Sequence, residues 1–303
     1  MMHAACEGRC YRVLRAARRV TVRVAWRTMA AVALVWLAIL STASHSQAAD
    51  SVQILGTESA WRSHVTFRPP VVGTARKILT HKKVPENWQY IGGDFASPLP
   101  PKDWTKPGFN DSGWTRGEGP FFGGYGNHRP AGVAIVCLRG RFAVHDPGKV
   151  GGLNLSLAFR GGVVVYLNGK EVARKHIGRG KLEPLTLADD YSKSAFVTPD
   201  GEALLPNYGR AKPPKDVVDR YESRIRKATI DVPAGMLRRG VNVLAIELHR
   251  TAIPADLPPF GRGVWDTTGL LSATLTAPAG SAIVDNTTGP GRVRIFQAAP
   301  WAR

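Results

Sequence analysis

The sequence predicts an all-β fold, an antiparallel β-sandwich with one long inserted loop. Two runs that read as β-strands, 162–168 and 170–176, are joined at the pair Asn168-Gly169. Such a pair is typical of a type I′ hairpin turn, because both central residues need φ > 0, which Asn and Gly reach at least steric cost. A further run at 241–249 alternates apolar and polar residues, and no long amphipathic helix separates the runs. The pattern therefore favours an antiparallel sheet over a parallel α/β sheet.

Residues 1–48 have the organisation of a secretory signal peptide. A basic region with seven arginines against Glu7 leads into the apolar run 29–40, and Ser46-Gln47-Ala48 supplies the small residues that precede a cleavage site. We therefore expect export to a secreted or periplasmic location. No membrane span is expected in the mature chain, and the run 29–40 is short for a bilayer span. A retained signal anchor and translation from Met29 are the alternatives.

The charge of the chain favours anionic partners. The 303 residues carry a formal net charge of +18, which falls to +12 when 1–48, with seven Arg and one Glu, is removed. Anionic partners include sulfated or uronic-acid polysaccharides, cell-envelope phosphates and nucleic acid bound non-specifically. The alternative is that scattered Lys and Arg keep an exported protein soluble. The basic residues are dispersed and no nucleic-acid-binding motif is present, so we expect no specific nucleic-acid partner.

The placement of the cysteines excludes an intrachain disulfide in the mature chain. Cys6 and Cys10 lie in the leader, and Cys137 lies inside the apolar run 133–138. An exported domain of this size must then rely on its core, or on a metal. Nothing near Cys137 indicates a lowered pKa, so we expect a buried, unreactive thiol.

Residues 49–85 are expected to form an N-terminal extension, and 86–277 the sandwich itself. The part from 88 to 126 is dense in aromatic and turn-forming residues, which indicates loop scaffolding held by large side chains. From Leu153 to Phe159 one face is apolar and the other polar, as a half-buried strand requires. Strands are expected at 132–144, 150–159, 162–168, 170–176, 226–232, 241–249 and 268–276.

The inserted loop, 177–225, is polar and rich in proline. A loop of this length is rare in a compact domain unless it has a task or is disordered. One short helix is expected around 215–223, and 233–240 is expected to be a tight crossover. We expect 278–303 to be a linker followed by a truncated C-terminal segment, with a further domain missing beyond it.

Three motifs in order carry a resemblance to a known family: Asp103-Trp104 through Gly124-Tyr125-Gly126, then 163–172, then 240–249. They resemble the galactose-binding-domain-like jelly-roll module. The chain is similar over 86–277 to the sugar-binding domain at the front of β-galactosidases and β-glucuronidases, and to modules of large secreted bacterial proteins. The resemblance implies a non-catalytic jelly roll that holds a glycan or another domain, sometimes with a structural calcium ion. The chain departs from the family in its long insertion, and it lacks the catalytic barrel of those hydrolases.

Candidate ligand-binding residues are aromatic side chains flanked by polar ones, because a sugar ring lies on an aromatic face while its hydroxyls need hydrogen-bond partners. We expect Trp104 and Trp114 to pack in the core, since the family motif they match is structural. Ligand contact is more credible in two predicted loops, at Tyr125, Asn127, His128, Arg129, Trp265 and Asp266. Asp189 and Asp190 are candidate calcium ligands, and a solvated acidic turn is the alternative.

Glu247 and His249 are two residues apart on a predicted strand and point to the same face. They fit an acid/base or metal pair. An exposed polar face explains them at least as well. The chain has no Gly-x-Ser-x-Gly elbow, no His-Glu-x-x-His and no phosphate-cradling glycine loop. We therefore expect no catalytic residues.

Three functions remain open on the sequence alone. The first is an exported, non-catalytic carbohydrate-binding module with a preference for anionic polysaccharide. The second is a structural module that packs against another domain of a larger secreted protein or glycoside hydrolase. The third is a glycoside hydrolase in its own right, which needs two carboxylates about 5–10 Å apart.

Overall fold

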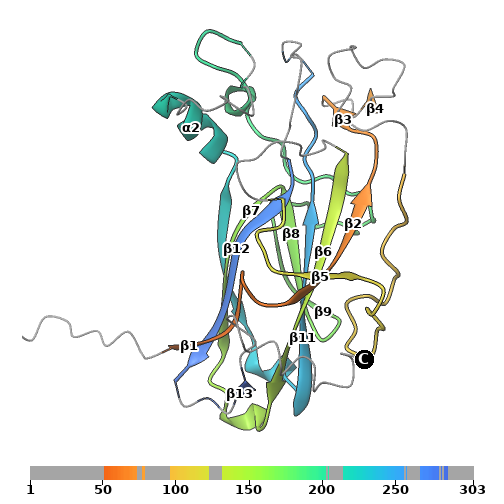
Figure 1. Cartoon of the computed structure of the whole chain (residues 1–303), viewed down its shortest axis with the longest axis vertical. Coiled ribbons are helices and arrows are strands. Elements are labelled where there is room, and N and C mark those ends of the chain that lie inside the picture. The colour runs from red at the N-terminus through yellow and green to blue at the C-terminus, as the bar shows by residue number, and fades with distance from the viewer. Residues whose placement is uncertain are drawn as a thin grey trace, which may run out of the picture. The chain divides into compact units, whose positions relative to one another are not determined.

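Two antiparallel β-sheets stacked face to face form the fold, as a computed structural model shows (Figure 1). The structure describes residues 51–73, 77–78, 96–122, 132–202, 204, 214–255, 257, 267–279, 281 and 283–285. All of them belong to the unit Ser51–Arg303. The predicted all-β sandwich is confirmed.

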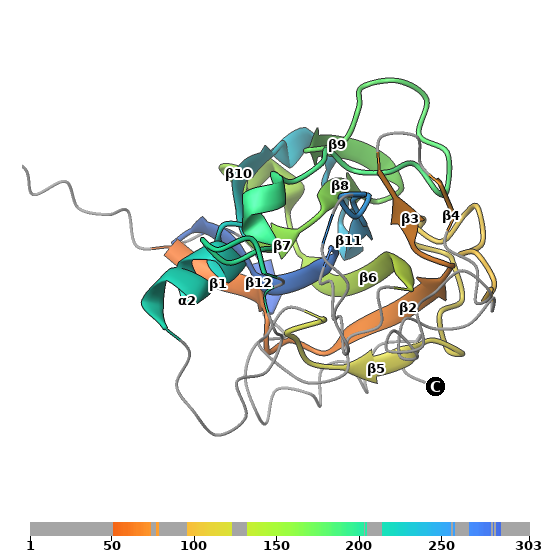
Figure 2. The ribbon, with the colours of Figure 1, turned by 90° about the horizontal axis from the view of Figure 1, so that it is seen from above.

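The smaller sheet has four strands in the order β1-β12-β7-β10, and every neighbouring pair is antiparallel. Its strands are β1 Ser51–Gly56, β12 Gly269–Pro278, β7 Leu153–Arg160 and β10 Arg226–Val232. In Figure 2 these four strands form one layer and the strands of the larger sheet form the other.

The larger sheet has the order β5-β2-β6-β11-β8-β9, with β13 beside β6. Its strands are β5 Thr115–Gly117, β2 Trp61–Phe67, β6 Val133–Val144, β11 Gly240–His249, β8 Gly162–Leu167, β9 Lys170–Lys175 and β13 Ile283–Asp285. A separate pair joins β3 Val71–Val72 to β4 Lys77–Ile78.

The helical elements among the described residues are short. The α-helix α2 spans Lys215–Glu222, as the sequence predicts for 215–223. Three 3₁₀ turns are η3 Pro147–Lys149, η4 Lys193–Ala195 and η5 Ala234–Met236. Within the described ranges, no helix is long and apolar enough to cross a membrane.

The predicted hairpin at Asn168-Gly169 is confirmed. Asn168 has φ 53° and Gly169 has φ 86°, the two positive values that a type I′ turn needs. The Asn168 side chain also accepts a hydrogen bond from the Val243 backbone N–H at 3.0 Å and donates one to the Met236 carbonyl at 3.0 Å. The turn is therefore fixed to both β11 and η5.

The main core lies between the two sheets. Alternate residues of facing strands meet there, among them Leu155, Leu157 and Phe159 of β7 and Leu244, Ile246 and Leu248 of β11. This is the apolar face that period-two alternation predicts.

The outer face of the larger sheet is also buried. Trp104, which is 4% exposed, packs there with Cys137 and Ala245, and its ring lies 5.7 Å from the ring of Trp114. The predicted core positions of Trp104 and Cys137 are confirmed. Burial, with a smaller effect from Glu247, raises the pKa of the Cys137 thiol well above its ordinary value.

The prediction that 49–85 lies ahead of the sandwich is wrong. β1 pairs with β12 in the smaller sheet, and β2 pairs with β6 in the larger one. Trp61 of β2 is fully buried, and its indole N–H donates to the Gly56 carbonyl at 2.9 Å. These strands are stabilised by partners far along the chain, which a local pattern does not reveal.

Candidate functional site

A cavity of about 370 Å³ opens at one end of the sandwich. One wall comes from the insertion and consists of Asp190, Tyr191 and Lys193. The opposite wall is the chain that follows β11, residues 252–255, together with Gly73. Three segments that are distant in the sequence therefore build one site.

The floor of the cavity is apolar. Ile253 packs with Ala195 and Phe196 in a small cluster, and Val72 and Tyr191 pack against it. Ile253 is 2% exposed. Asp190 and Lys193 are exposed and supply the polar rim. An apolar floor with a few polar groups around it is the usual composition of a small-ligand site.

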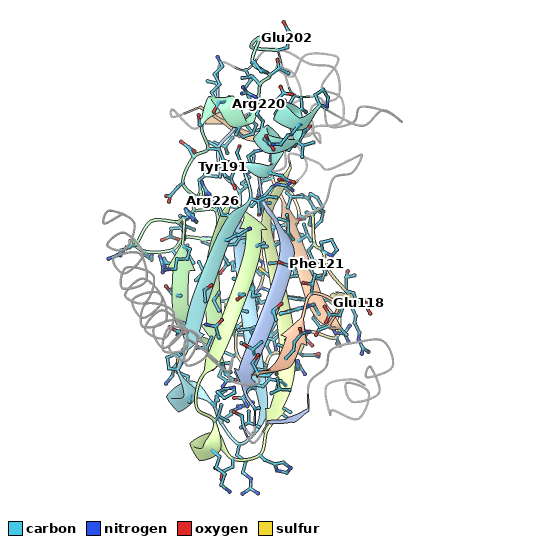
Figure 3. The ribbon with its side chains drawn as sticks, turned by 90° about the vertical axis from the view of Figure 1, so that its left-hand side faces the viewer. Glu118, Phe121, Tyr191, Glu202, Arg220 and Arg226 are labelled. Carbon is cyan, nitrogen blue, oxygen red and sulfur yellow. The ribbon has the colours of Figure 1, made fainter. Side chains whose placement is uncertain are left out.

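Tyr191 is held by two hydrogen bonds. Its hydroxyl donates to the Arg224 carbonyl at 2.7 Å and accepts from the Gly161 backbone N–H at 2.7 Å. The Arg226 guanidinium lies 4.1 Å from the centre of the ring (Figure 3). Burial raises the pKa of Tyr191. The ring is thus a fixed part of the cavity wall.

Arg226 fixes the shape of the acidic turn beside Tyr191. One of its terminal nitrogens donates to the Gly161 carbonyl at 2.9 Å, and the other donates to the carbonyls of Asp189 at 2.8 Å and Asp190 at 3.3 Å. These hydrogen bonds are accepted by backbone oxygens, so the side-chain carboxylates of Asp189 and Asp190 take no part in them.

The helix α2 supports the same wall from behind. Arg220 donates to the carbonyls of Ser194 and Val197, at 2.9 and 3.0 Å. The Arg224 guanidinium lies between two rings, 4.8 Å from Phe196 and 4.9 Å from Tyr221. Figure 3 shows Tyr191, Arg226 and Arg220 at the same end of the sandwich.

The net positive charge of the protein is not concentrated at this wall. The residues of the insertion that line the cavity include one acid, Asp190, and one base, Lys193. The wall is therefore charge-balanced, and nothing in it favours an anionic ligand over a neutral one.

All six predicted ligand-binding residues lie outside the described residues. Tyr125, Asn127, His128 and Arg129 fall in 123–131, and Trp265 and Asp266 fall in 258–266. Their role in binding stays a prediction.

The candidate calcium ligands separate in the structure. Asp190 lines the cavity, while the Asp189 side chain is 62% exposed and lies 4.0 Å from Nδ1 of His176. Burial, assisted by Arg226, lowers the pKa of His176. Among the described residues, no group of three or more His, Cys, Asp and Glu side chains gathers to hold a metal. Calcium binding stays a prediction.

Sequence reasoning missed Tyr191, Lys193 and Ile253 as parts of a site. Tyr191 was recognisable as an aromatic residue beside two carboxylates in a long insertion. Nothing in the sequence pairs it with Ile253, because their contact depends on how the insertion folds back over the end of β11.

The interpretation of Glu247 and His249 as an exposed polar face is wrong, since they are 6% and 0% exposed. The Tyr166 hydroxyl donates to Glu247 Oε2 at 2.9 Å. His249 Nδ1 donates to the Thr186 carbonyl at 2.8 Å, and its Nε2 lies 3.3 Å from Glu247 Oε1. Burial, followed by the charge of Glu247, raises the pKa of Tyr166. The group links the insertion to the sheet and leaves almost no surface for a substrate.

No protein-family model matches the chain, and no curated protein matches it. Among solved structures, a calcium-binding mutant of Bacteroides uniformis β-glucuronidase 2 is similar at 13% identity and a TM-score of 0.38, over 75% of this chain and 18% of that one. Bifidobacterium dentium β-glucuronidase complexed with coumarin-3-O-glucuronide is similar at 11% identity and a TM-score of 0.37, over 76% of this chain and 30% of that one.

A β-glycosidase from Bacteroides vulgatus is similar at 14% identity and a TM-score of 0.34, over 75% of this chain and 20% of that one. The chain therefore spans less than a third of the length of these proteins. TM-scores this low do not indicate a function for this chain. The resemblance to the galactose-binding-domain-like family stays a prediction.

Proposed function

We propose that the protein is an exported, non-catalytic β-sandwich that binds a glycan in the cavity beside Tyr191. The observation that carries the proposal is the combination of an apolar floor around Ile253 with the polar rim of Asp190 and Lys193. The cavity volume of about 370 Å³ falls within the range of about 300–1,000 Å³ that is usual for ligand sites. Export rests on the leader at 1–48.

The chemistry of the walls suits a sugar. Pro254 and Ala255, the residues of the apolar wall that are not buried, pack against the C–H face of a pyranose ring, while the Asp190 carboxylate accepts hydrogen bonds from hydroxyls and Lys193 donates them. Tyr191 is rigid, so its part of the wall costs little conformational entropy when a ligand binds. The buried state of Glu247 and His249 supports a role in binding over catalysis.

The test is binding of the full chain to an array of neutral and acidic glycans at physiological salt. Ala255→Trp places a large side chain in the cavity mouth and should abolish binding, and Asp190→Asn should weaken it at least tenfold. Lys227→Ala is the matched control, because Lys227 is exposed on β10. Binding that persists in Ala255→Trp contradicts the proposal. No binding at all would favour the domain-packing module.

A further inference from the structure

A second surface lies at the other end of β11. The cavity follows His249 at the end of this strand, whereas the turns near Gly240 at its start gather basic residues. This is the lower end of the sandwich in Figure 1, where β13 lies. We call it the basic end, and its exposed cationic residues are Lys106, Lys149, Lys170, Arg238 and Arg239.

The pairing of the strands brings these residues to one end. Val144 at the end of β6 is opposite Gly240 at the start of β11, so the turn with Lys149 lies beside the turn with Arg238 and Arg239. The two 3₁₀ turns η3 and η5 are in contact.

The hairpin turn before Lys170 joins the same end. Asn168 donates to the Met236 carbonyl of η5 at 3.0 Å, which fixes the β8–β9 turn against the β10–β11 connection. Lys106 packs on the other side of this turn, since a Cβ added to Gly169 would lie 3.2 Å from Lys106 Cγ.

The three turns carry mostly positive charge. In 145–152, 168–170 and 233–240 the one acidic residue is Asp146, against Lys149, Lys170, Arg238 and Arg239. Near these turns, Asp103 precedes Lys106 and is exposed, and Glu171 follows Lys170 but pairs with Arg174 at 2.7 Å. Asp146 lies 3.4 Å from Lys149, but the two side chains are 46% and 75% exposed. Such a surface pair is weak and leaves Lys149 able to bind another anion. The cavity wall, in contrast, has equal numbers of acidic and basic residues.

We propose that the basic end binds an anionic polysaccharide, independently of the glycan in the cavity. Sulfate and carboxylate groups need only Lys and Arg partners, which the basic end supplies. Single-stranded nucleic acid also needs aromatic side chains on which bases stack. The three turns contain no Phe, Tyr or Trp, so a polysaccharide is the better partner.

The test is retention of the full chain on immobilised heparin, measured over a range of NaCl concentrations. The triple variant Lys149→Glu, Lys170→Glu, Arg239→Glu should elute at much lower salt. The slope of log K against log salt should fall by up to about three, roughly one for each lost contact, as counterion release requires. A matched control, Lys175→Glu, Arg179→Glu, Lys227→Glu, makes the same change in net charge at exposed positions elsewhere. Circular dichroism checks that both variants fold.

Two outcomes overturn the inference about the basic end. Either both triple variants lose retention equally, which shows an effect of net charge alone, or the basic-end variant is retained like the native protein. Retention on single-stranded DNA to higher salt than on heparin would overturn the choice of polysaccharide. Ala255→Trp should leave retention on heparin unchanged, because Ala255 lines the cavity at the other end of β11. Binding at the basic end is thus tested separately from glycan binding in the cavity.

Discussion

Asp111 holds the aromatic segment around Trp104 and Trp114 on the outer face of the larger sheet. Its Oδ2 accepts from Arg139 Nε at 2.7 Å and from Arg141 Nη2 at 2.9 Å, and its side chain is 1% exposed. Arg139 in turn donates to the Trp104 carbonyl. Replacing Asp111 by Ala removes the anion and leaves two buried guanidinium groups without it.

The cost of Asp111→Ala follows from these contacts. A hydrogen bond to a charged group contributes about 1.5–3 kcal/mol, so two of them contribute about 3–6 kcal/mol. Breaking a buried ion pair from one side costs about 3–5 kcal/mol by mutational evidence. Burial lowers the pKa of Arg141 to about 10 although Asp111 opposes the change, which shows that desolvation there is large. We expect a loss of about 3–5 kcal/mol, a large part of the roughly 5–15 kcal/mol of a typical domain.

Urea unfolding followed by tryptophan fluorescence measures this loss. The midpoint should fall while the slope m stays the same, since the same surface is exposed on unfolding. Asp200→Ala, at an exposed carboxylate, is the matched control and should change stability by less than about 0.5 kcal/mol. A loss below about 1 kcal/mol in Asp111→Ala would show that other groups compensate the charges of Arg139 and Arg141, and would contradict this expectation.

Three further substitutions or probes test the fold. Gly169→Ala should cost about 1–2 kcal/mol, because φ 86° is strained for a residue with a Cβ; an unchanged melting temperature would contradict this. Tyr191→Phe leaves a buried backbone N–H without its acceptor and should cost about 1–3 kcal/mol in urea unfolding, and no loss would mean that the wall is not fixed as described. In a chain with Cys6→Ser and Cys10→Ser, burial and the raised pKa of Cys137 should make its alkylation slow until denaturant is added. Fast labelling of the native protein would show that the thiol is accessible.

The strands that the sequence predicted are those with strong local signals. The hairpin at Asn168-Gly169 and the alternation in β7 and β11 depend on neighbouring residues, and both were predictable. β1 was not, because its partner is β12, and Ser51 pairs with Pro278 from the other end of the domain. The burial of Glu247 and His249 was missed for a similar reason. Alternation shows which residues share a face, but not whether another segment covers that face.

The candidate site was less predictable than the fold. Asp190 stood out in the sequence as part of an acidic turn, and the structure places it at the cavity. The remaining wall depends on Arg226 reaching back to the Asp189 and Gly161 carbonyls, and on the chain after β11 folding beneath Tyr191. These contacts join segments tens of residues apart, and no spacing rule connects them.

The burial of the sheets restricts where a ligand can bind. The larger sheet is covered on both faces, and Trp104, Cys137 and Glu247 fill its outer side. On the smaller sheet, Ser156 lies in register with Thr229 and Thr274, and its polar outer positions offer no aromatic platform for a sugar. Among the described residues, the two ends of the sandwich are therefore better candidates for ligand binding than the faces of its sheets.

The strand β11 sets the distance between these two ends. It has ten residues, which at about 3.3 Å each span about 30 Å. Substitutions at sites this far apart, with no shared residues, usually have effects on stability that add within about 0.3–0.5 kcal/mol. We therefore expect Ala255→Trp and the triple variant at the basic end to act separately. Each should reduce binding at its own end of β11 and leave binding at the other end unchanged.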